Sequence, residues 1–279
     1  MSGPERAVNL GFVDLGDDAA PVADKEYSVI SAASLTLAAR QYPQQTAHRR
    51  AKLDLLKFYI DDLPDFTHNN EGLFKLQVYT EDPENIDKGS AKVSFVTDFT
   101  AKDGAFAPTF LYRGVFRNVL FSEFLNIRFD LFEIDVNLKD AFGKVKKVLE
   151  TVPEVKSLDV LKGVPYLSLA TGLLDGIVDV FGKNSDDHIW GECPILELAP
   201  APGGAYLRTG IYVIYEAVNS EKKAIVPSDL RYKNEVLLVA GKKAPNYVVF
   251  NLLLSSHTPP PPSATLLTLP FGIVATPAH

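Results

Sequence analysis

The sequence predicts a mainly β protein, an antiparallel sandwich with two inserted helices and an extended arm at each end. Short runs rich in Val, Phe, Tyr and Leu alternate with polar turn clusters from residue 52 onward, a pattern typical of such sandwiches. Within one of these runs, residues 125–136, apolar and polar side chains alternate with the period of two expected of a strand. Over residues 138–182 the period changes to that of a helix.

The composition limits the class of protein. The chain has 279 residues, of which 46% are hydrophobic and 23% charged, as in ordinary globular proteins. Its net charge of −7 argues against a nucleic-acid binder, which normally carries a basic face. The single cysteine, Cys193, excludes an intramolecular disulfide framework and a cysteine-rich zinc site. Because we find no apolar leader and no run of about 18 apolar residues, we expect a cytoplasmic protein without a membrane-spanning helix.

An irregular N-terminal arm is predicted over residues 1–45. Residues 14–21 are acidic and small, as in turns, and residues 28–40 form a short apolar segment that suits either a strand or a short helix. The main domain is then expected over residues 46–258.

The first half of this domain contains five predicted strands. Four of them are separated by polar turn clusters, and they cover residues 53–60, 73–79, 92–99 and 109–121. In the fifth, residues 125–136, the apolar phase slips by one residue at Leu131 and Phe132. This slip predicts either a β-bulge at that step or burial on both faces beyond it.

The helical insertion is predicted over residues 138–182, between two strands of the domain. The first helix, residues 138–152, is amphipathic, with Asn137 as its N-cap and Pro153 as its stop. The second, residues 166–181, is much more apolar and is followed by a glycine. We expect the apolar faces to pack together and against the sandwich; a location in a membrane interface is the other interpretation.

Strands resume after the insertion and complete the expected core. They cover residues 195–198, 206–218, 234–239 and 247–254, and residues 200–204 are predicted to connect the first two as a hairpin. From the alternating runs we expect one sandwich core that includes Leu55, Phe58, Ile60, Phe129, Leu131, Ile211, Val213 and Tyr215.

A proline-rich spacer and an apolar C-terminal arm are predicted over residues 259–279. Four consecutive prolines, residues 259–262, favour a stiff polyproline segment. Residues 264–279 then contain many apolar side chains, so we expect the arm to pack along an edge of its own sheet or on another chain.

Most enzymatic signatures are absent from the sequence. It contains no Gly-x-Ser-x-Gly elbow, no His-Glu-x-x-His, no Walker phosphate loop and no Gly-x-Gly-x-x-Gly after a strand. The five histidines are scattered over predicted loops, and a lone Cys193 is more often a small apolar filler than a nucleophile. These observations predict a non-enzymatic protein.

Acidic residues gather in three predicted loops. Calcium takes six to eight oxygen ligands, typically several carboxylates from separate loops. If the loops meet at one end of the sandwich, they offer a calcium site; if they do not, the aspartates are solvated turn residues. The candidate ligands are Asp62, Asp65, Asp135, Asp186 and Asp187.

Three segments resemble C2 domains. Residues 55–64 (Leu-Leu-Lys-Phe-Tyr-Ile-Asp-Asp-Leu-Pro) resemble the opening strand and first loop of that family. Residues 129–135 are similar to the strand that leads into the third, acidic loop, and residues 184–192 resemble the end of that loop. The resemblance covers residues 52–255. It implies an eight-stranded antiparallel C2-like sandwich, a fold that binds calcium and phospholipid in many members.

The sequence also departs from the C2 pattern. The helical pair would lie inside the third loop, where typical members have only a few residues. Asp135-Val136-Asn137 lacks the second carboxylate of the family's Asp-x-Asp, and residues 73–75 replace its Ser-Asp-Pro-Tyr element. Each missing carboxylate lowers the expected calcium affinity. The departures therefore favour a calcium-independent interaction domain.

Together these features predict a non-enzymatic interaction or structural protein that acts through protein contacts in an assembly. Its expected partners are further copies of the chain or another protein, with no nucleic acid and no cofactor other than possible calcium. The alternative is a peripheral membrane-binding protein assisted by calcium, and a hydrolase of unfamiliar type comes third.

Overall fold

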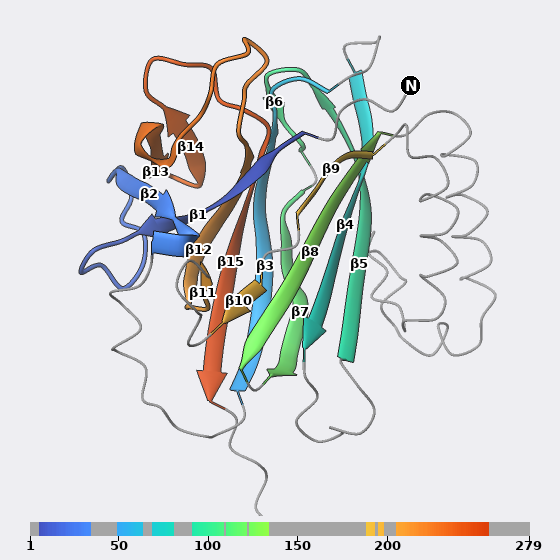
Figure 1. Cartoon of the computed structure of the whole chain (residues 1–279), viewed down its shortest axis with the longest axis vertical. Helices are drawn as coiled ribbons and strands as arrows, with labels where there is room; N and C mark the ends of the chain where they lie inside the picture. Colours follow the sequence, from blue (N-terminus) through green and yellow to red (C-terminus); the bar gives the residue numbers. More distant parts are fainter. Residues whose placement is uncertain are drawn as a thin grey trace, which may run out of the picture.

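The protein is mainly β, as predicted. The structure is a computed structural model, and it describes residues 6–34, 49–63, 69–80, 91–108, 110–121, 123–133, 188–192, 195–197 and 205–256. In this part of the chain fifteen strands form one nine-stranded and one six-stranded sheet, called sheet A and sheet B (Figure 1).

Sheet A contains the strands from both ends of the described chain. Its order is β14-β13-β2-β1-β12-β15-β3-β6, and β7 also pairs with β3. All its pairs are antiparallel. Its strands are β1 (Val8–Asp14), β2 (Tyr27–Ser31), β3 (Arg49–Ile60), β6 (Ala105–Phe106), β7 (Tyr112–Phe121), β12 (Gly210–Glu216), β13 (Leu230–Lys233), β14 (Val236–Val239) and β15 (Tyr247–Ser256).

Sheet B is smaller and has the order β11-β10-β8-β4-β5, with β9 also paired to β8. One pair, β10 with β11, is parallel, and the others are antiparallel. Its strands are β4 (Asn69–Thr80), β5 (Ala91–Lys102), β8 (Phe124–Glu133), β9 (His188–Glu192), β10 (Ile195–Glu197) and β11 (Ala205–Tyr206).

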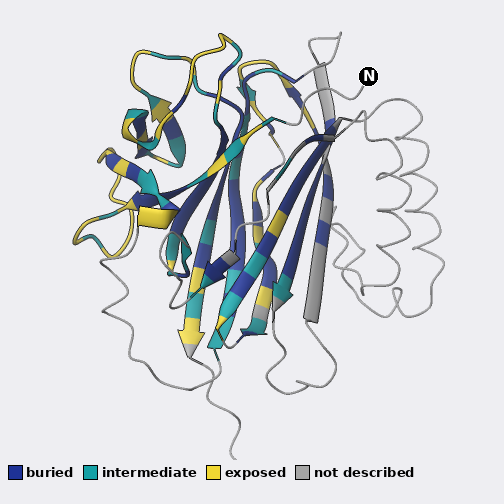
Figure 2. Cartoon of the chain, viewed as in Figure 1, coloured by how far each residue is buried: buried dark blue, intermediate teal, exposed yellow. Residues whose placement is uncertain are grey.

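The two sheets share one large hydrophobic core. The ring of Phe58 from sheet A lies 6.2 Å from that of Phe74 in sheet B, and Phe129 of sheet B lies 5.1 Å from Phe250 of sheet A. Buried positions follow the long strands in the middle of the molecule, whereas the loops on the left of Figure 2 are exposed. Alternate residues of β3, β4, β8 and β15 supply this core, as the period of two requires.

A second hydrophobic core covers the other face of sheet A. It contains Leu56, Ile211, Val213, Tyr215 and Val249, which point away from sheet B. The segment between β12 and β15, with β13, β14 and the short helix η5 (Pro227–Asp229), adds Ile225, Leu230, Tyr232 and Leu237 to it. The middle of sheet A is therefore buried on both faces.

This second core corrects one sequence expectation. Leu55, Phe58, Ile60, Phe129 and Leu131 belong to the core between the sheets, as predicted. Ile211, Val213 and Tyr215 do not, because they lie in the second core, and Tyr212 and Ile214 occupy the first. Since all of β12 from Ile211 to Glu216 is buried, its apolar pattern does not reveal which residues point toward sheet B and which point into the second core.

The prediction of an irregular N-terminal arm is wrong for residues 6–34. β1 pairs with β12 on one side and β2 on the other, so it is an interior strand of sheet A. Of the two readings of residues 28–40, a strand is the correct one for residues 28–31. Fifteen strands in the described part also exceed the eight that the C2 resemblance implies.

The irregularity predicted at Leu131 and Phe132 is confirmed, but it lies on the partner strand. The register of β8 with β9 shifts between these two residues, and Ile189 of β9 is the extra residue. β8 itself pairs with β4 without a shift. Leu131 and Phe132 are both buried, so β8 is covered on both faces at this step; the second reading of the slip concerns residues 133–136, whose side chains lie outside what the structure describes.

The predicted hairpin after residue 195 is not found. β10 and β11 pair in parallel, and β12 belongs to the other sheet. The predicted helical insertion, residues 138–182, and the C-terminal spacer and arm, residues 259–279, lie outside the described residues. No helix in the described part is long and apolar enough to span a membrane.

Candidate functional site

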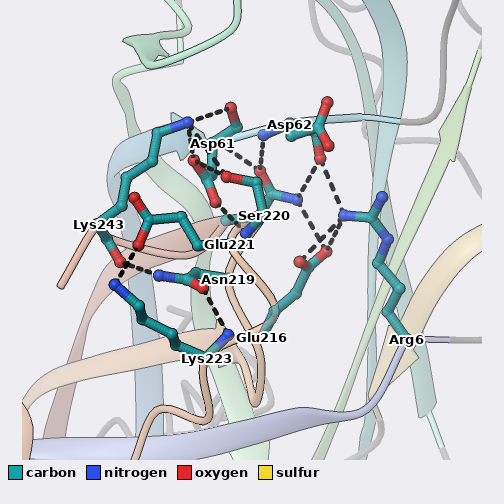
Figure 3. Close-up of polar contacts among 10 residues, drawn as sticks. Arg6, Asp61, Asp62, Glu216, Asn219, Ser220, Glu221, Lys223 and Lys243 are labelled. Carbon is teal, nitrogen blue, oxygen red and sulfur yellow. Dashed lines mark hydrogen bonds and ion pairs between the residues drawn. The ribbon is translucent and has the colours of Figure 1, made fainter.

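A buried polar cluster joins four segments that are far apart in the sequence. Arg6 precedes β1, Asp61 and Asp62 follow β3, Glu216 ends β12, and Asn246 precedes β15. Ser220 and Lys243 from the segment between β12 and β15 complete it (Figure 3). The carboxylates and amides of this cluster meet at the end of sheet A where these strands begin or end.

Asn246 lies at the centre of the cluster and is fully buried. Its side-chain oxygen accepts hydrogen bonds from the backbone N–H groups of Asp61 and Asp62, at 2.6 and 3.3 Å. Its side-chain nitrogen donates to the carbonyl of Asp62 at 3.0 Å and to Glu216 Oε1 at 2.8 Å. An asparagine amide offers two donors and two acceptor lone pairs, so every position is used.

Asp61 is buried and neutralised by one lysine. Its carboxylate accepts hydrogen bonds from the backbone N–H of Ser220 at 2.7 Å and from the Ser220 hydroxyl at 3.0 Å. Lys243 Nζ lies 2.5 Å from Asp61 Oδ1 and donates to Ser220 Oγ at 3.2 Å. Lys243 thus supplies the opposite charge for the Asp61 carboxylate, whose burial without a partner would cost free energy.

Glu216 is held by Arg6 and Asn246. Arg6 Nη1 lies 3.1 Å from Glu216 Oε2 and also donates to the carbonyl of Asp62 at 2.9 Å. Burial raises the pKa of the Glu216 carboxyl, while Arg6 and the hydrogen bond from Asn246 lower it by less. The folded protein therefore favours the protonated carboxyl more than the unfolded chain does.

The cluster holds a serine beside a lysine, and its electrostatics decide what that pair can do. A Ser-Lys pair acts in acyl transfer only when the lysine is neutral and can take the hydroxyl proton. Here the hydrogen bond to Asp61 raises the pKa of Lys243, which keeps the ammonium charged. The arrangement fixes strand ends and loops in place; the charged Lys243 cannot take the Ser220 proton, and the hydroxyl donates to Asp61 instead.

A separate cavity of about 700 Å³ opens on the face of sheet A that points away from sheet B. We call it the outer-face cavity. Its floor includes Leu56 of β3, Ile211 of β12, and Asn251 and Leu253 of β15. Its walls are residues 12–16 and 18–23 from β1 and the loop that follows, residues 208–210, Arg113 of β7, and Tyr232, Asn234 and Glu235 from the β13–β14 hairpin.

Charged and apolar groups are mixed along this cavity. Val22 and Leu253 are large apolar side chains that are 51% and 38% exposed. Among the lining carboxylates, Asp18 is paired with Lys25 at 2.6 Å and Glu235 lies 3.9 Å from Lys57. Arg113 and Arg208 have no carboxylate partner among the residues that the structure describes.

The structure describes one of the five aspartates predicted as calcium ligands. Asp62 is the second residue after β3, and its backbone is bonded to Arg6 and Asn246. Asp65, Asp135, Asp186 and Asp187 lie outside the described residues, so their convergence on Asp62 stays a prediction. Within the described residues no group of three or more His, Cys, Asp or Glu side chains is placed to hold a metal ion.

Sequence reasoning missed most of both sites. It singled out the Asp61–Asp62 turn, but not Arg6, Glu216, Lys243 or Asn246, whose partners are between about thirty and two hundred residues away along the chain. No local pattern marks such residues, because they are brought together by the order of the strands in sheet A.

No family model matches this chain, and no curated protein or solved structure is significantly similar to it.

Proposed function

We propose that this chain is a non-enzymatic interaction protein that binds an extended segment of another protein in the outer-face cavity. The observation that carries the proposal is the cavity itself, which opens on sheet A, the larger of the two sheets. Sites of about 300–1,000 Å³ hold a few side chains rather than a folded domain, which suits an extended segment.

The chemistry of the lining supports a peptide as the occupant. A peptide brings apolar side chains together with backbone donors and acceptors. Val22, Ile211 and Leu253 offer apolar contacts, and the amide of Asn251 offers both a donor and an acceptor. The exposed apolar side chains would lose contact with water when the segment binds, which supplies affinity.

A labelled probe peptide tests this proposal. The probe is a fluorescein-labelled Leu-Glu-Leu-Glu-Leu, and its anisotropy is followed as the full chain is added. The double variant Val22→Ser, Leu253→Ser should bind it at least about tenfold more weakly, because it removes two apolar contacts. The matched control is Val226→Ser, Leu238→Ser, whose side chains are 46% and 39% exposed and lie outside the cavity lining. Absence of binding at millimolar concentration, or equal loss in both doubles, would contradict the proposal.

Calcium separates this function from the peripheral membrane alternative. The proposed function uses no metal, so we expect the melting temperature to stay unchanged when several millimolar calcium is added. An increase that the variant Asp62→Asn abolishes would instead support calcium binding at the predicted aspartates, because a ligand that binds only the folded state raises its stability. Pelleting with anionic vesicles only in calcium would then favour the membrane alternative.

Three further expectations belong to the same proposal. A C2-like strand order remains a prediction from the resemblance, and a cytoplasmic location remains a prediction from the sequence. Self-association remains a prediction from the apolar residues in 264–279. Light scattering on the full chain and on a chain that lacks residues 259–279 tests the last of these. An unchanged oligomeric state would contradict contact through that segment.

A further inference from the structure

The outer-face cavity carries more unpaired positive charge than negative charge. Three carboxylates and two guanidinium groups line it. Asp18 is bonded to Lys25 and to the hydroxyl of Tyr27 at 2.7 Å, and Glu235 lies near Lys57. Asp14 accepts a hydrogen bond from the backbone N–H of Gly16. In the part of the chain that the structure describes, Arg113 and Arg208 are bonded to no carboxylate, although the whole protein has a net charge of −7.

Arg208 is the more constrained of the two arginines. Its guanidinium lies 5.2 Å from the centre of the Phe12 ring, which orients it by a cation–π contact. The Phe12 ring fits there because the neighbouring residue is Gly210: a Cβ atom at that position would lie 2.6 Å from the ring. The Nε atom of Arg208 is buried and has no hydrogen-bond partner among the described residues.

A buried donor without a partner costs free energy, and more so when it belongs to a charged group. A carboxylate is the natural partner for this group, because a guanidinium presents two parallel N–H donors that match the two oxygens of a carboxylate. Arg113 is exposed on the same cavity and adds a second positive charge for the same anion.

Resting on the proposed function, we infer that the segment bound in the outer-face cavity carries an Asp or Glu side chain between apolar residues. Arg208 binds the carboxylate, with Arg113 as the second positive charge. The apolar neighbours contact Val22 on the wall of the cavity and Leu253 on its floor. The partner is therefore an acidic and apolar segment of another protein.

Two blocked peptides that differ only in charge test the inference. The probes are acetyl-Leu-Glu-Leu-Glu-Leu-amide and its Leu-Gln-Leu-Gln-Leu counterpart, each titrated into the full chain by calorimetry. We expect the glutamate peptide to bind about tenfold more tightly or better, in line with a charged hydrogen-bonded pair. The variants Arg208→Met and Arg113→Met should each reduce that preference. Arg208→Lys should keep more of the preference than Arg208→Met but less than the wild type, because an ammonium lacks the two parallel N–H donors of a guanidinium.

The readouts separate failure of the inference from failure of the function. If both peptides bind equally well, or if Arg208→Met leaves the preference unchanged, the carboxylate inference is overturned and the proposed function stands. If neither peptide binds, both the carboxylate inference and the proposed function are overturned. Binding of the glutamine peptide to Arg208→Met, with an unchanged melting temperature, shows that the variant is folded; Arg113→Met, at an exposed position, provides a second variant. Tighter binding of decanoate than of the glutamate peptide, at the same arginine, would assign the cavity to a free amphiphilic acid and overturn the protein segment.

Discussion

Glu216 shows how one side chain depends on residues from distant parts of the sequence. Its carboxylate contacts Arg6 from the start of the chain and Asn246 from the start of β15. A glutamate at the end of a strand has no sequence signal that distinguishes it from an exposed one. In β12 it shares a face with Tyr212 and Ile214, which belong to the core between the sheets, and it is buried there with Arg6 and Asn246 as partners.

The raised pKa of Glu216 leads to a prediction about stability and pH. The folded pKa lies above the ordinary value of 4.5, so this group's contribution to stability is complete below that value and is lost as the pH rises through the folded pKa. The variant Glu216→Gln has no such titration. We therefore expect the free energy of unfolding of the wild type, relative to Glu216→Gln, to fall as the pH rises above the ordinary value of 4.5 and through the folded pKa.

Urea unfolding of both proteins across this range measures the difference. The variant Glu221→Gln, in an exposed ion pair with Lys223, is the matched control. A difference that is constant or rises with pH would contradict the assignment of a buried, protonation-favouring site to Glu216.

Among the strands, β12 best illustrates what the sequence could predict. The long strands β3, β4, β5, β8 and β15 were all expected within a few residues, because apolar runs bounded by polar turns mark them. In β12 the existence of the strand was predicted but the inward face was not. Alternation identifies a face only when the other face is polar, and β12 has apolar residues on both.

Because β12 is buried on both faces, substitutions on either face should be costly. We expect Ile211→Ala, in the second core, and Ile214→Ala, between the sheets, each to lower the free energy of unfolding by about 2–5 kcal/mol. The control Val218→Ala, at a position that is 44% exposed, should change it by less than about 0.5 kcal/mol. Chemical denaturation gives all three values. A near-neutral Ile211→Ala would mean that the second core does not form.

On the scale of the whole molecule, the N-terminal residues complete the larger sheet. β1 lies between β2 and β12, so within the described strands β2, β13 and β14 are joined to the rest of sheet A through β1. β1 and the loop after it also form a wall of the outer-face cavity. The sequence suggested an arm here because residues 14–21 are acidic and small, as in turns. Its place in the sheet depends on pairing with residues about two hundred positions away, which local patterns do not record.

Hydrogen exchange of the backbone amides of β1 in the full chain tests this account most directly, because both the nine-stranded sheet and the cavity depend on that strand. We expect peptides covering Val8–Asp14 to exchange as slowly as those covering Gly210–Glu216, their partner in the sheet. Exchange over residues 8–14 at the rate of an unstructured chain, while residues 210–216 stay protected, would contradict it.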